Sequence, residues 1–386
     1  MAEAQNHASP ADPVPNARLE EAAARLRRLV AEVLSGLTRK IDEDGHYPEN
    51  FLRAYGRDYG FGHAVDPGYG GQPGGLVGVI TGMEACSEEC VSTGFLVWCQ
   101  TSCAWYLQKS GNAALKRSLL PAICSGEQLA GTGLSNLLKA RSQIEPLRLR
   151  ATQAPGGYRL LGTLPWISNL APGAVFAVGA ATNDGTLLAL ARVGAPGLAL
   201  TRAGPFCGLD GTSTMSCRFD NVFVGRGDII ADEAEFDSFF ARMRAGLILA
   251  QMGMALGLTQ GALTLIEEAR SLARPTDTFV QHQPDGLRER LRVARADTLT
   301  AAQALDVGAP PPFTEILAIR ARGAVLALDS AQGALLHCGA RGYLERHPAQ
   351  RRLREAYFIA IVTPALKHLC RDLARDAGAR DATPAV

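Results

Sequence analysis

Two pairs of cysteines are the first residues in this chain whose type and spacing could do chemistry. Cys86 with Cys90, and Cys99 with Cys103, each have the i, i+4 spacing that presents two sulfurs on one helical face. On a single helix, the 13 residues from Cys86 to Cys99 would be a rotation of about 220°, which places the two pairs on nearly opposite faces. The seven histidines are scattered along the chain. We therefore expect no metal site and interpret the four thiols as buried structural side chains.

A glycine-rich segment is the next candidate. Gly131 to Asn136 reads GTGLSN, which resembles part of a dinucleotide-binding fingerprint, but Asn136 replaces the third glycine. No strand, loop and helix unit surrounds the segment, so a doubly wound nucleotide site is not expected. The glycines are interpreted as a place where the chain passes close to a ligand or another backbone. Neither a Gly-x-Ser-x-Gly elbow nor a phosphate-binding P-loop is present.

Composition excludes several classes of function. The chain has 386 residues, 47% hydrophobic and 20% charged, which predicts two or three globular modules. The charges of the 39 basic and 38 acidic residues nearly cancel, so the chain has no positive electrostatic field that would attract nucleic acid. Nine cysteines, an odd and sparse number, indicate a reducing compartment. Apolar runs are far shorter than the roughly 20 residues of a membrane span. We expect a cytoplasmic protein with no nucleic-acid partner and no membrane insertion.

The elements that must position such residues follow from hydrophobic periodicity. Residues 1–16 are expected to be a flexible tail. Apolar positions at three- and four-residue steps predict a helix from Ala17 to near Gly45, and the mostly apolar residues 76–122 predict two or three more. Alternating or continuous apolar stretches then predict strands between about 128 and 230. The helical period returns over 236–272, 286–307, 313–338 and 350–378.

The predicted fold class is therefore α+β. It consists of an N-terminal helical domain at 17–127, a middle β-barrel-like or sandwich domain at 128–231, and a C-terminal four-helix bundle at 232–386. A doubly wound sheet is excluded because alternating β and α units are absent.

Several segments, in order along the chain, resemble motifs of the acyl-CoA dehydrogenase superfamily. The segment DPGYGGQPGG resembles the family's turn rich in proline and glycine, and LPWISN resembles its flavin-facing strand. The matching segments are Asp66 to Gly75, Ser110 to Glu127, Leu164 to Asn169, Phe219 to Val224, Gly339 to Tyr343 and Arg354 to Ala356. The resemblance implies FAD held between the subunits of a dimer or tetramer. It also implies an acyl thioester substrate, with an electron-transferring flavoprotein or a flavin reductase as redox partner.

The resemblance also implies which residues bind the cofactor. Trp166 would pack beside the isoalloxazine and Ser168 would hydrogen-bond the flavin, with Ile167 between them. Leu134 and Ser135 would contact the pyrimidine edge of the flavin. The remaining cofactor residues implied are Arg274 and Gln283, on a pyrophosphate-binding segment that reaches a neighbouring subunit, and Gly339 and Gly342. For the substrate, the resemblance implies Ser142 and Arg244.

The catalytic base of the family has no counterpart at its two usual positions. An α,β-dehydrogenation needs a carboxylate to remove the substrate α-proton. Thr363, nine residues after Arg354, occupies the commoner position, and Ala245 occupies the other. Neither side chain is a base near neutral pH. We interpret Thr363 as a helix N-cap followed by Pro364 at the first helical position.

Three interpretations of the function stay open from the sequence. The first is a flavin-dependent oxidoreductase acting on an acyl thioester, with a base elsewhere or a substrate activated enough to need none. The second is a flavin-dependent monooxygenase that uses reduced flavin and O2. The third is a non-catalytic binding or scaffold protein that kept the fold. The first is favoured because the segments at Gly342 and Arg354 look more like the dehydrogenase branch. Arg244, beside the vacant helix position, either binds an anion there or lies on a solvated helix face.

Overall fold

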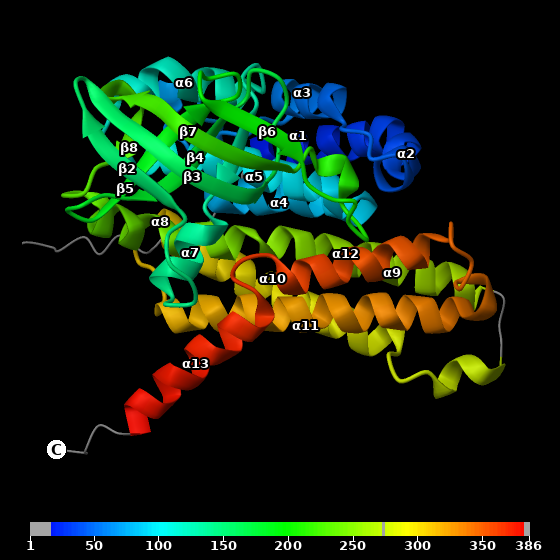
Figure 1. The fold of residues 1–386 in the computed structure, drawn as a ribbon. Helices are drawn as coiled ribbons and strands as arrows, with labels where there is room; N and C mark the ends of the chain where they lie inside the picture. The colour runs from blue at the N-terminus through cyan, green and yellow to red at the C-terminus, as the bar shows by residue number, and fades with distance from the viewer. Residues whose placement is uncertain (1–16, 272–274, 382–386) are drawn as a thin grey trace, which may run out of the picture.

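The computed structural model describes residues 17–271 and 275–381, so the expected tail at 1–16 lies outside the described residues. The chain runs from a group of helices into a curled sheet and then into a helical bundle (Figure 1). The first helices are α1 (Ala17–Leu29), α2 (Thr38–Glu43), α3 (Glu49–Asp58), α4 (Gly75–Glu89), α5 (Val91–Lys109) and α6 (Ala113–Ser125). The helix expected from Ala17 is confirmed, although a π turn and a 3-10 turn interrupt it at residues 30–37.

Helix α5 is the central helix of this first group. Every residue from Val91 to Leu107 is buried, which is the pattern of a helix packed on all sides. Cys86, Cys90, Cys99 and Cys103, which lie in α4, in α5 and between them, are buried and form no disulfide with one another. Burial raises the pKa of the Cys103 thiol to about 12, so that side chain stays protonated at neutral pH. Within the described residues, no group of three or more His, Cys, Asp or Glu side chains is arranged to hold a metal ion.

The middle part of the chain forms one mixed sheet. Its strands are β1 (Ala130–Gly133), β2 (Leu149–Ala154), β3 (Gly157–Ile167), β4 (Val175–Ala181), β5 (Thr186–Arg192), β6 (Leu198–Arg202), β7 (Met215–Gly225) and β8 (Ile229–Ala231), with α7 (Ser135–Arg141) after β1. The order is β6-β7-β3-β2-β4-β5-β8, and β1 pairs in parallel with β4. Phe176 of β4 and Phe219 of β7 lie 6.3 Å apart although β3 and β2 stand between their strands. The sheet therefore curls around its own apolar core, which is the barrel-like arrangement that the sequence predicts.

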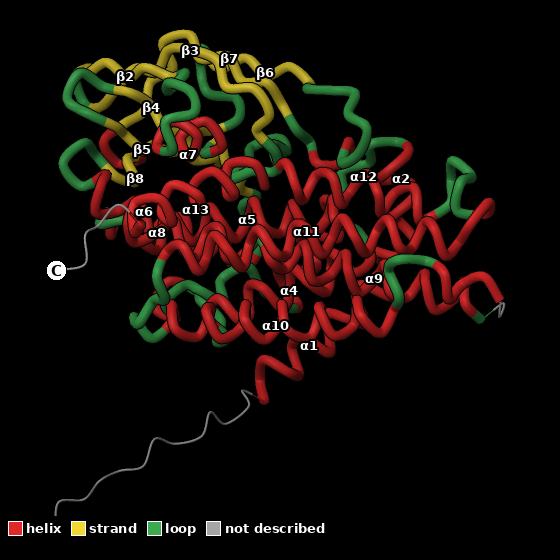
Figure 2. The backbone as a smooth tube through the Cα atoms, turned by 90° about the horizontal axis from the view of Figure 1, so that it is seen from below, coloured by secondary structure: helices red, strands yellow, loops and turns green. Residues whose placement is uncertain are grey.

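The C-terminal part is the predicted helical bundle. Its helices are α8 (Phe236–Ala250), α9 (Met252–Arg270), α10 (Pro284–Asp306), α11 (Phe313–Cys338), α12 (Pro348–Ile361) and α13 (Leu366–Asp381). Figure 2 shows the strands on one side of these helices. The run Phe236–Arg270 is long and apolar enough to cross a membrane, but 94% of its apolar window is buried inside the protein. It is the core helix of the bundle rather than an exposed apolar segment.

The predicted helix over 350–378 is divided in the structure. The period over 350–378 predicts a single helix, whereas the structure has α12 and α13 separated by a turn at residues 362–365. Pro364 has no backbone N–H and restricts the residue before it, so the helix cannot continue through it. Helix α13 then leaves the bundle at a steep angle (Figure 1). The turn places Thr363 away from any helix interior.

A buried ion cluster holds α12 against α4. The Glu355 carboxylate accepts hydrogen bonds from Arg351 at 3.1 Å, from Arg352 at 3.2 Å and from the Val91 backbone N–H at 3.0 Å. Arg351 and Arg352 also donate to main-chain carbonyls in the last turn of α4. The side chain of Glu355 is 2% exposed, so its negative charge compensates two guanidinium groups that water barely reaches.

Replacing Glu355 by alanine would leave two arginines without their buried counter-charge. We expect Glu355→Ala to lower the free energy of unfolding by about 3 to 5 kcal/mol, measured by urea denaturation. Glu289→Ala is the matched control, since it removes a carboxylate from an exposed ion pair with Arg292 and should leave the midpoint unchanged. Equal midpoints for the two variants would show that the buried cluster contributes nothing.

Candidate active site

The start of α7 and the end of β3 lie against each other beside the sheet. Thr132 of β1 pairs with Ser168 in an isolated antiparallel bridge. A Cβ atom on Gly133 would lie 3.1 Å from Cδ1 of Ile167, so the two segments are in close contact. Leu134 and Ser135 follow directly and begin α7. The structure thus gathers the residues for which the sequence predicts contacts with the flavin ring: Leu134, Ser135, Trp166, Ile167 and Ser168.

Trp166 presents its side chain outward from the end of β3. Its indole is 61% exposed, and its backbone φ of 61° is in the left-handed region that bulky residues rarely adopt. The pairing of β3 with β7 is irregular between Leu164 and Ile167, which turns this residue out of the strand pattern. A large exposed ring held in an uncommon backbone conformation is typical of a binding surface. The indole face offers an aromatic platform for a planar ring.

The residues after Trp166 are fixed by buried hydrogen bonds. The Ser168 hydroxyl lies 2.7 Å from Oγ1 of Thr214. Asn169 accepts a hydrogen bond from the Tyr47 hydroxyl and donates one to the Ala130 carbonyl, both at 2.7 Å. A hydroxyl has one donor and two acceptor positions, so Ser168 retains capacity for a further hydrogen bond.

Thr363 lies directly beside this group. Its Oγ1 is 2.8 Å from Oγ of Ser135, and its carbonyl accepts a hydrogen bond of 2.9 Å from the Gln251 side chain. The expected N-cap role of Thr363 is wrong, because α13 begins only at Leu366 and the hydroxyl bonds to Ser135 instead. The interaction joins the position of the family's base to the segment expected to face the flavin.

The buried side chain of Arg320 contacts the Thr363 turn through Gln251. Arg320 Nε donates to Oε1 of Gln251 at 2.8 Å, and another guanidinium nitrogen donates to the Ile359 carbonyl near the end of α12. Burial lowers the pKa of Arg320 to about 10, so the group is still charged at neutral pH. Within the described part of the chain, no carboxylate pairs with Arg320. Main-chain and amide oxygens accept hydrogen bonds from two of its nitrogens, which connects α11 to α12 and to the Thr363 turn, and the third nitrogen, Nη1, is buried without a hydrogen-bond partner in the described residues.

Sequence reasoning missed Gln251 and Arg320. Gln251 stands between α8 and α9 in a run that reads as one apolar helix, and no local motif marks it. Arg320 is a charged residue at a position where the helical period of α11 demands an apolar one, next to buried Ile316 and Ala324. That mismatch is the one signal in the sequence that could have identified it.

The two residues proposed for substrate binding contact different helices. Arg244 places its guanidinium 4.0 Å from the ring centre of Phe313, and burial together with the nearby charge of Arg141 lowers the pKa of Arg244. Arg244 is thus engaged with an aromatic ring. Ser142 Oγ lies 3.5 Å from a carboxylate oxygen of Asp372 in α13. Ala245 is half-buried, and its methyl group offers no proton acceptor.

The other residues expected to bind the cofactor, as far as the structure describes them, lie at the start of α10 and after the end of α11, two element ends that Figure 1 shows at the end of the bundle away from α13. Gln283, which directly precedes α10, donates to the Asp277 and Val280 carbonyls of the preceding turn, and Gly339 and Gly342 follow the end of α11. Arg274 lies outside the described residues. Helix α11 has 26 residues and spans about 39 Å. Gly339 lies 19 residues, or about 28 Å along the helix, after Arg320, which hydrogen bonds connect through Gln251 and Thr363 to Ser135, so one chain does not bring Gly339 to Ser135.

Comparison with known proteins decides the family. The family model "Acyl-CoA dehydrogenase, N-terminal domain" matches residues 16–127, and "Acyl-CoA dehydrogenase, C-terminal domain" matches residues 236–376. This chain belongs to the acyl-CoA dehydrogenase superfamily. Mitochondrial isovaleryl-CoA dehydrogenase of Arabidopsis thaliana is 25% identical over 82% of this chain and 80% of its own length. L-prolyl-[peptidyl-carrier protein] dehydrogenase of Pseudomonas fluorescens is 26% identical over 76% of this chain and 81% of its own.

A solved structure shows the same fold. Butyryl-CoA dehydrogenase from Megasphaera elsdenii matches with a TM-score of 0.84 at 18% identity, over 95% of this chain and all of the other. The predicted sequence of a helical domain, a sheet domain and a helical bundle is therefore confirmed. The cofactor of this superfamily is FAD, which accepts a hydride at its ring.

The residues present fit the ring of that cofactor. Trp166 supplies an exposed aromatic face, Ser168 keeps a free hydrogen-bonding position, and Ser135 holds a hydroxyl at the start of α7. These groups would bind and orient the flavin ring. None of them titrates near neutral pH, so they move no proton on their own.

Replacing Trp166 by alanine tests this placement. We expect Trp166→Ala to weaken flavin binding about tenfold, because it removes the exposed aromatic platform while leaving the strand's buried hydrogen bonds in place. Flavin absorbance per protein after gel filtration, together with a fluorescence titration, measures the change. Phe223→Ala, at a half-exposed ring on the neighbouring strand β7, is the control. Unchanged flavin binding in the Trp166 variant would overturn the placement.

Proposed function

We propose that this chain is an FAD-dependent oxidoreductase that oxidises an acyl thioester without a carboxylate base at either usual position of its superfamily. The hydrogen bond between Ser135 and Thr363 carries the proposal. It keeps the position expected for the base within hydrogen-bonding distance of the segment expected to face the flavin. Position 363 therefore lacks a carboxylate, but it still lies against Ser135.

The missing carboxylate limits the substrates that can react. Oxidation at the α and β carbons releases a hydride from one and a proton from the other, and the proton needs an acceptor. The hydrogen-bonding partners of Thr363 in the described residues are Ser135 and Gln251, and neither is ionised. We infer a thioester whose α-proton is acidified by a further electron-withdrawing group, so that water or buffer accepts it.

The same observation favours one second function. A monooxygenase that uses reduced flavin and O2 needs no α-proton abstraction, so neutral Thr363 and Ala245 would not impair it. An added flavin reductase would then supply the electrons. An electron-transferring flavoprotein would instead receive them from the dehydrogenase. These partners, and the assembly into a dimer or tetramer, are part of the proposal.

The thioester carrier has two candidates. The relative from Arabidopsis is named for a coenzyme A thioester, and the relative from Pseudomonas for a peptidyl-carrier protein. Both carriers present the acyl group on the same pantetheine arm, so the chemistry at the flavin would be the same for either.

The visible spectrum of the purified protein tests the proposal. We expect bound oxidised flavin that bleaches on anaerobic mixing with an acyl thioester carrying an acidic α-proton. Bound flavin that no thioester bleaches, but that consumes O2 once reduced by a flavin reductase, would favour the monooxygenase. Protein that binds no flavin in either redox state would contradict both.

Restoring a carboxylate at position 363 gives a second test. We expect Thr363→Glu to bleach with unactivated butanoyl-CoA at least about 100-fold faster than wild type, because a positioned general base contributes that much or more. Stopped-flow absorbance of the flavin measures the rate. Thr363→Gln matches the new side chain in size but has no charge, so a glutamate variant no faster than the glutamine variant would show that residue 363 does not face the substrate.

A further inference from the structure

The hydroxyl of Ser168 belongs to a line of three buried hydroxyls. Its Oγ lies 2.7 Å from Oγ1 of Thr214, which lies 2.7 Å from Oγ1 of Thr212. Thr212 in turn donates to the Leu209 carbonyl at 2.7 Å. All three hydroxyl side chains are buried, so water does not compete for these bonds. We refer to Ser168, Thr214 and Thr212 as the hydroxyl relay.

The carbonyl at the end of the relay fixes the direction of every hydrogen bond in it. A carbonyl oxygen only accepts, so the single hydroxyl proton of Thr212 is used on Leu209. Thr212 must then accept from Thr214, and Thr214 must accept from Ser168, because each hydroxyl has one proton. The proton of Ser168 is thus committed to Thr214. What Ser168 retains for a ligand is the capacity to accept.

Main-chain hydrogen bonds hold the loop of the two threonines against the residues after Ser168. The Asn169 N–H donates to the Thr212 carbonyl at 3.0 Å, and the Leu170 N–H donates to the Ser213 carbonyl at 3.3 Å. The Ser213 hydroxyl donates to the Leu170 carbonyl at 2.9 Å. None of these three bonds uses a threonine side chain. The position of the loop therefore does not depend on the relay hydroxyls.

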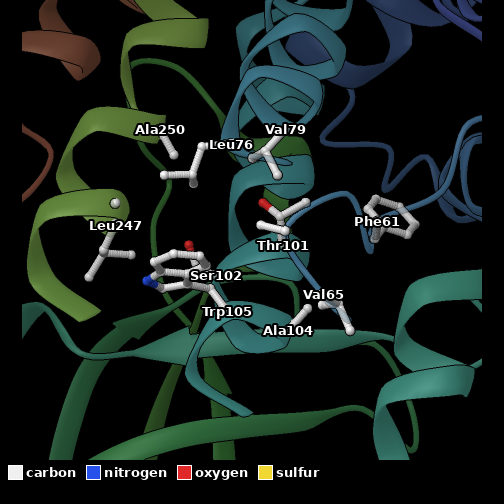
Figure 3. Close-up of a pocket in the computed structure, with 12 residues that line it drawn as sticks. Phe61, Val65, Leu76, Val79, Thr101, Ser102, Ala104, Trp105, Leu247 and Ala250 are labelled. Atoms are coloured by element: carbon white, nitrogen blue, oxygen red, sulfur yellow. The ribbon is translucent and has the colours of Figure 1, made fainter. Parts of the chain in front are cut away.

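The relay lies apart from the small cavity between α5 and α8. Figure 3 shows this cavity, whose walls, as far as the structure describes them, include Trp105 and Leu247 but none of the three relay residues. The indole N–H of Trp105 donates to the Met243 carbonyl at 2.9 Å, and that of Trp98 donates to the Leu247 carbonyl at 3.3 Å. These bonds hold α5 against α8 independently of the relay. Removing a relay hydroxyl therefore leaves this cavity unchanged.

A hydroxyl that can only accept distinguishes the two redox states of a flavin. Reduction converts one nitrogen of the flavin ring from a hydrogen-bond acceptor into an N–H donor. Ser168 is expected to hydrogen-bond this ring, and its lone pairs match the donor of the reduced form. Facing the oxidised form, the same lone pairs meet another acceptor, and a buried polar group without a partner is unfavourable. The direction of the relay therefore favours reduced flavin.

We propose that Thr212 and Thr214 are positioning residues that orient the Ser168 hydroxyl as an acceptor, so that the site binds reduced flavin more tightly than oxidised flavin. This inference rests on the proposed FAD-dependent function. By linkage, tighter binding of the reduced form raises the midpoint potential of the bound flavin and makes it a stronger oxidant. The two threonines act through Ser168 and need no contact with the flavin themselves.

Replacing Thr214 by valine tests the inference. The change keeps the shape of the side chain but removes its hydroxyl, which frees the Ser168 proton. We expect the affinity for reduced flavin relative to oxidised flavin to fall at least tenfold, which for a two-electron couple lowers the midpoint potential by about 30 mV. Anaerobic redox titration of the flavin-loaded protein measures it. Thr214→Ser should restore the wild-type potential, and Thr212→Val, which removes the bond that fixes the direction, should lower it.

The control is Thr259→Val, which removes a buried hydroxyl whose bond to the Ala255 carbonyl lies within α9. It should keep the wild-type potential. In a Ser168→Ala background, Thr214→Val should have no further effect, because the threonine acts through Ser168. An unchanged potential in folded, flavin-loaded Thr214→Val, or a shift that persists without Ser168, would overturn the inference and leave the proposed function in place. Protein that binds no flavin in either redox state would overturn both.

Discussion

The arrangement of the site depends on buried arginines that bind the main-chain carbonyls of neighbouring helices. Arg351 and Arg352 hold the last turn of α4, and Arg320 holds the end of α12. A guanidinium is costly to bury, and carbonyls at the C-terminal end of a helix, which carry partial negative charge, compensate part of that cost although Arg320 Nη1 and Arg352 Nε have no hydrogen-bond partner in the described residues. These contacts fix α12 along its whole length. The turn that follows α12 is positioned as a result.

The turn that carries Thr363 connects the helical bundle to the candidate active site. Arg320, Gln251, Thr363 and Ser135 form one continuous series of hydrogen bonds from the bundle core to the start of α7. Each bond in such a series polarises the next in a medium of low dielectric. The series contains one full positive charge and no negative one among its members. A neutral hydroxyl at position 363 is compatible with it, and the same geometry would accommodate a carboxylate.

The sequence predicts the order and type of most elements because their periodicities are strong. The helices of the bundle and the alternating strand at Met215 are examples. The apolar period over 350–378 continues on both sides of Thr363, and the helix start that Thr363 and Pro364 suggest falls three residues later, at Leu366. The contact of Thr363 with Ser135 joins residues 228 positions apart, and no local pattern encodes such a distance. Short elements such as α7, β6 and β8 carry too few residues for a period to appear.

The orientation of side chains in and near the site was less predictable from the sequence than the helices and strands that carry them. Helix α5 is buried on every face, so its sequence pattern does not show which neighbouring elements Trp98 and Trp105 contact. Trp166 was identified from its motif, but its outward orientation depends on an irregularity in strand pairing that only the three-dimensional register shows. Packing between distant elements, rather than local propensity, decides both features.

The separation of the two groups of cofactor residues along α11 has a thermodynamic consequence. A flavin nucleotide that contacts Trp166 of one copy and the turn at Gly339 of another would be a ligand of the assembly and not of the single chain. By mass action, its binding and the association of the copies would then stabilise each other. Dilution would release cofactor even at constant free flavin. The occupancy of the active site would thus report how much of the protein is assembled.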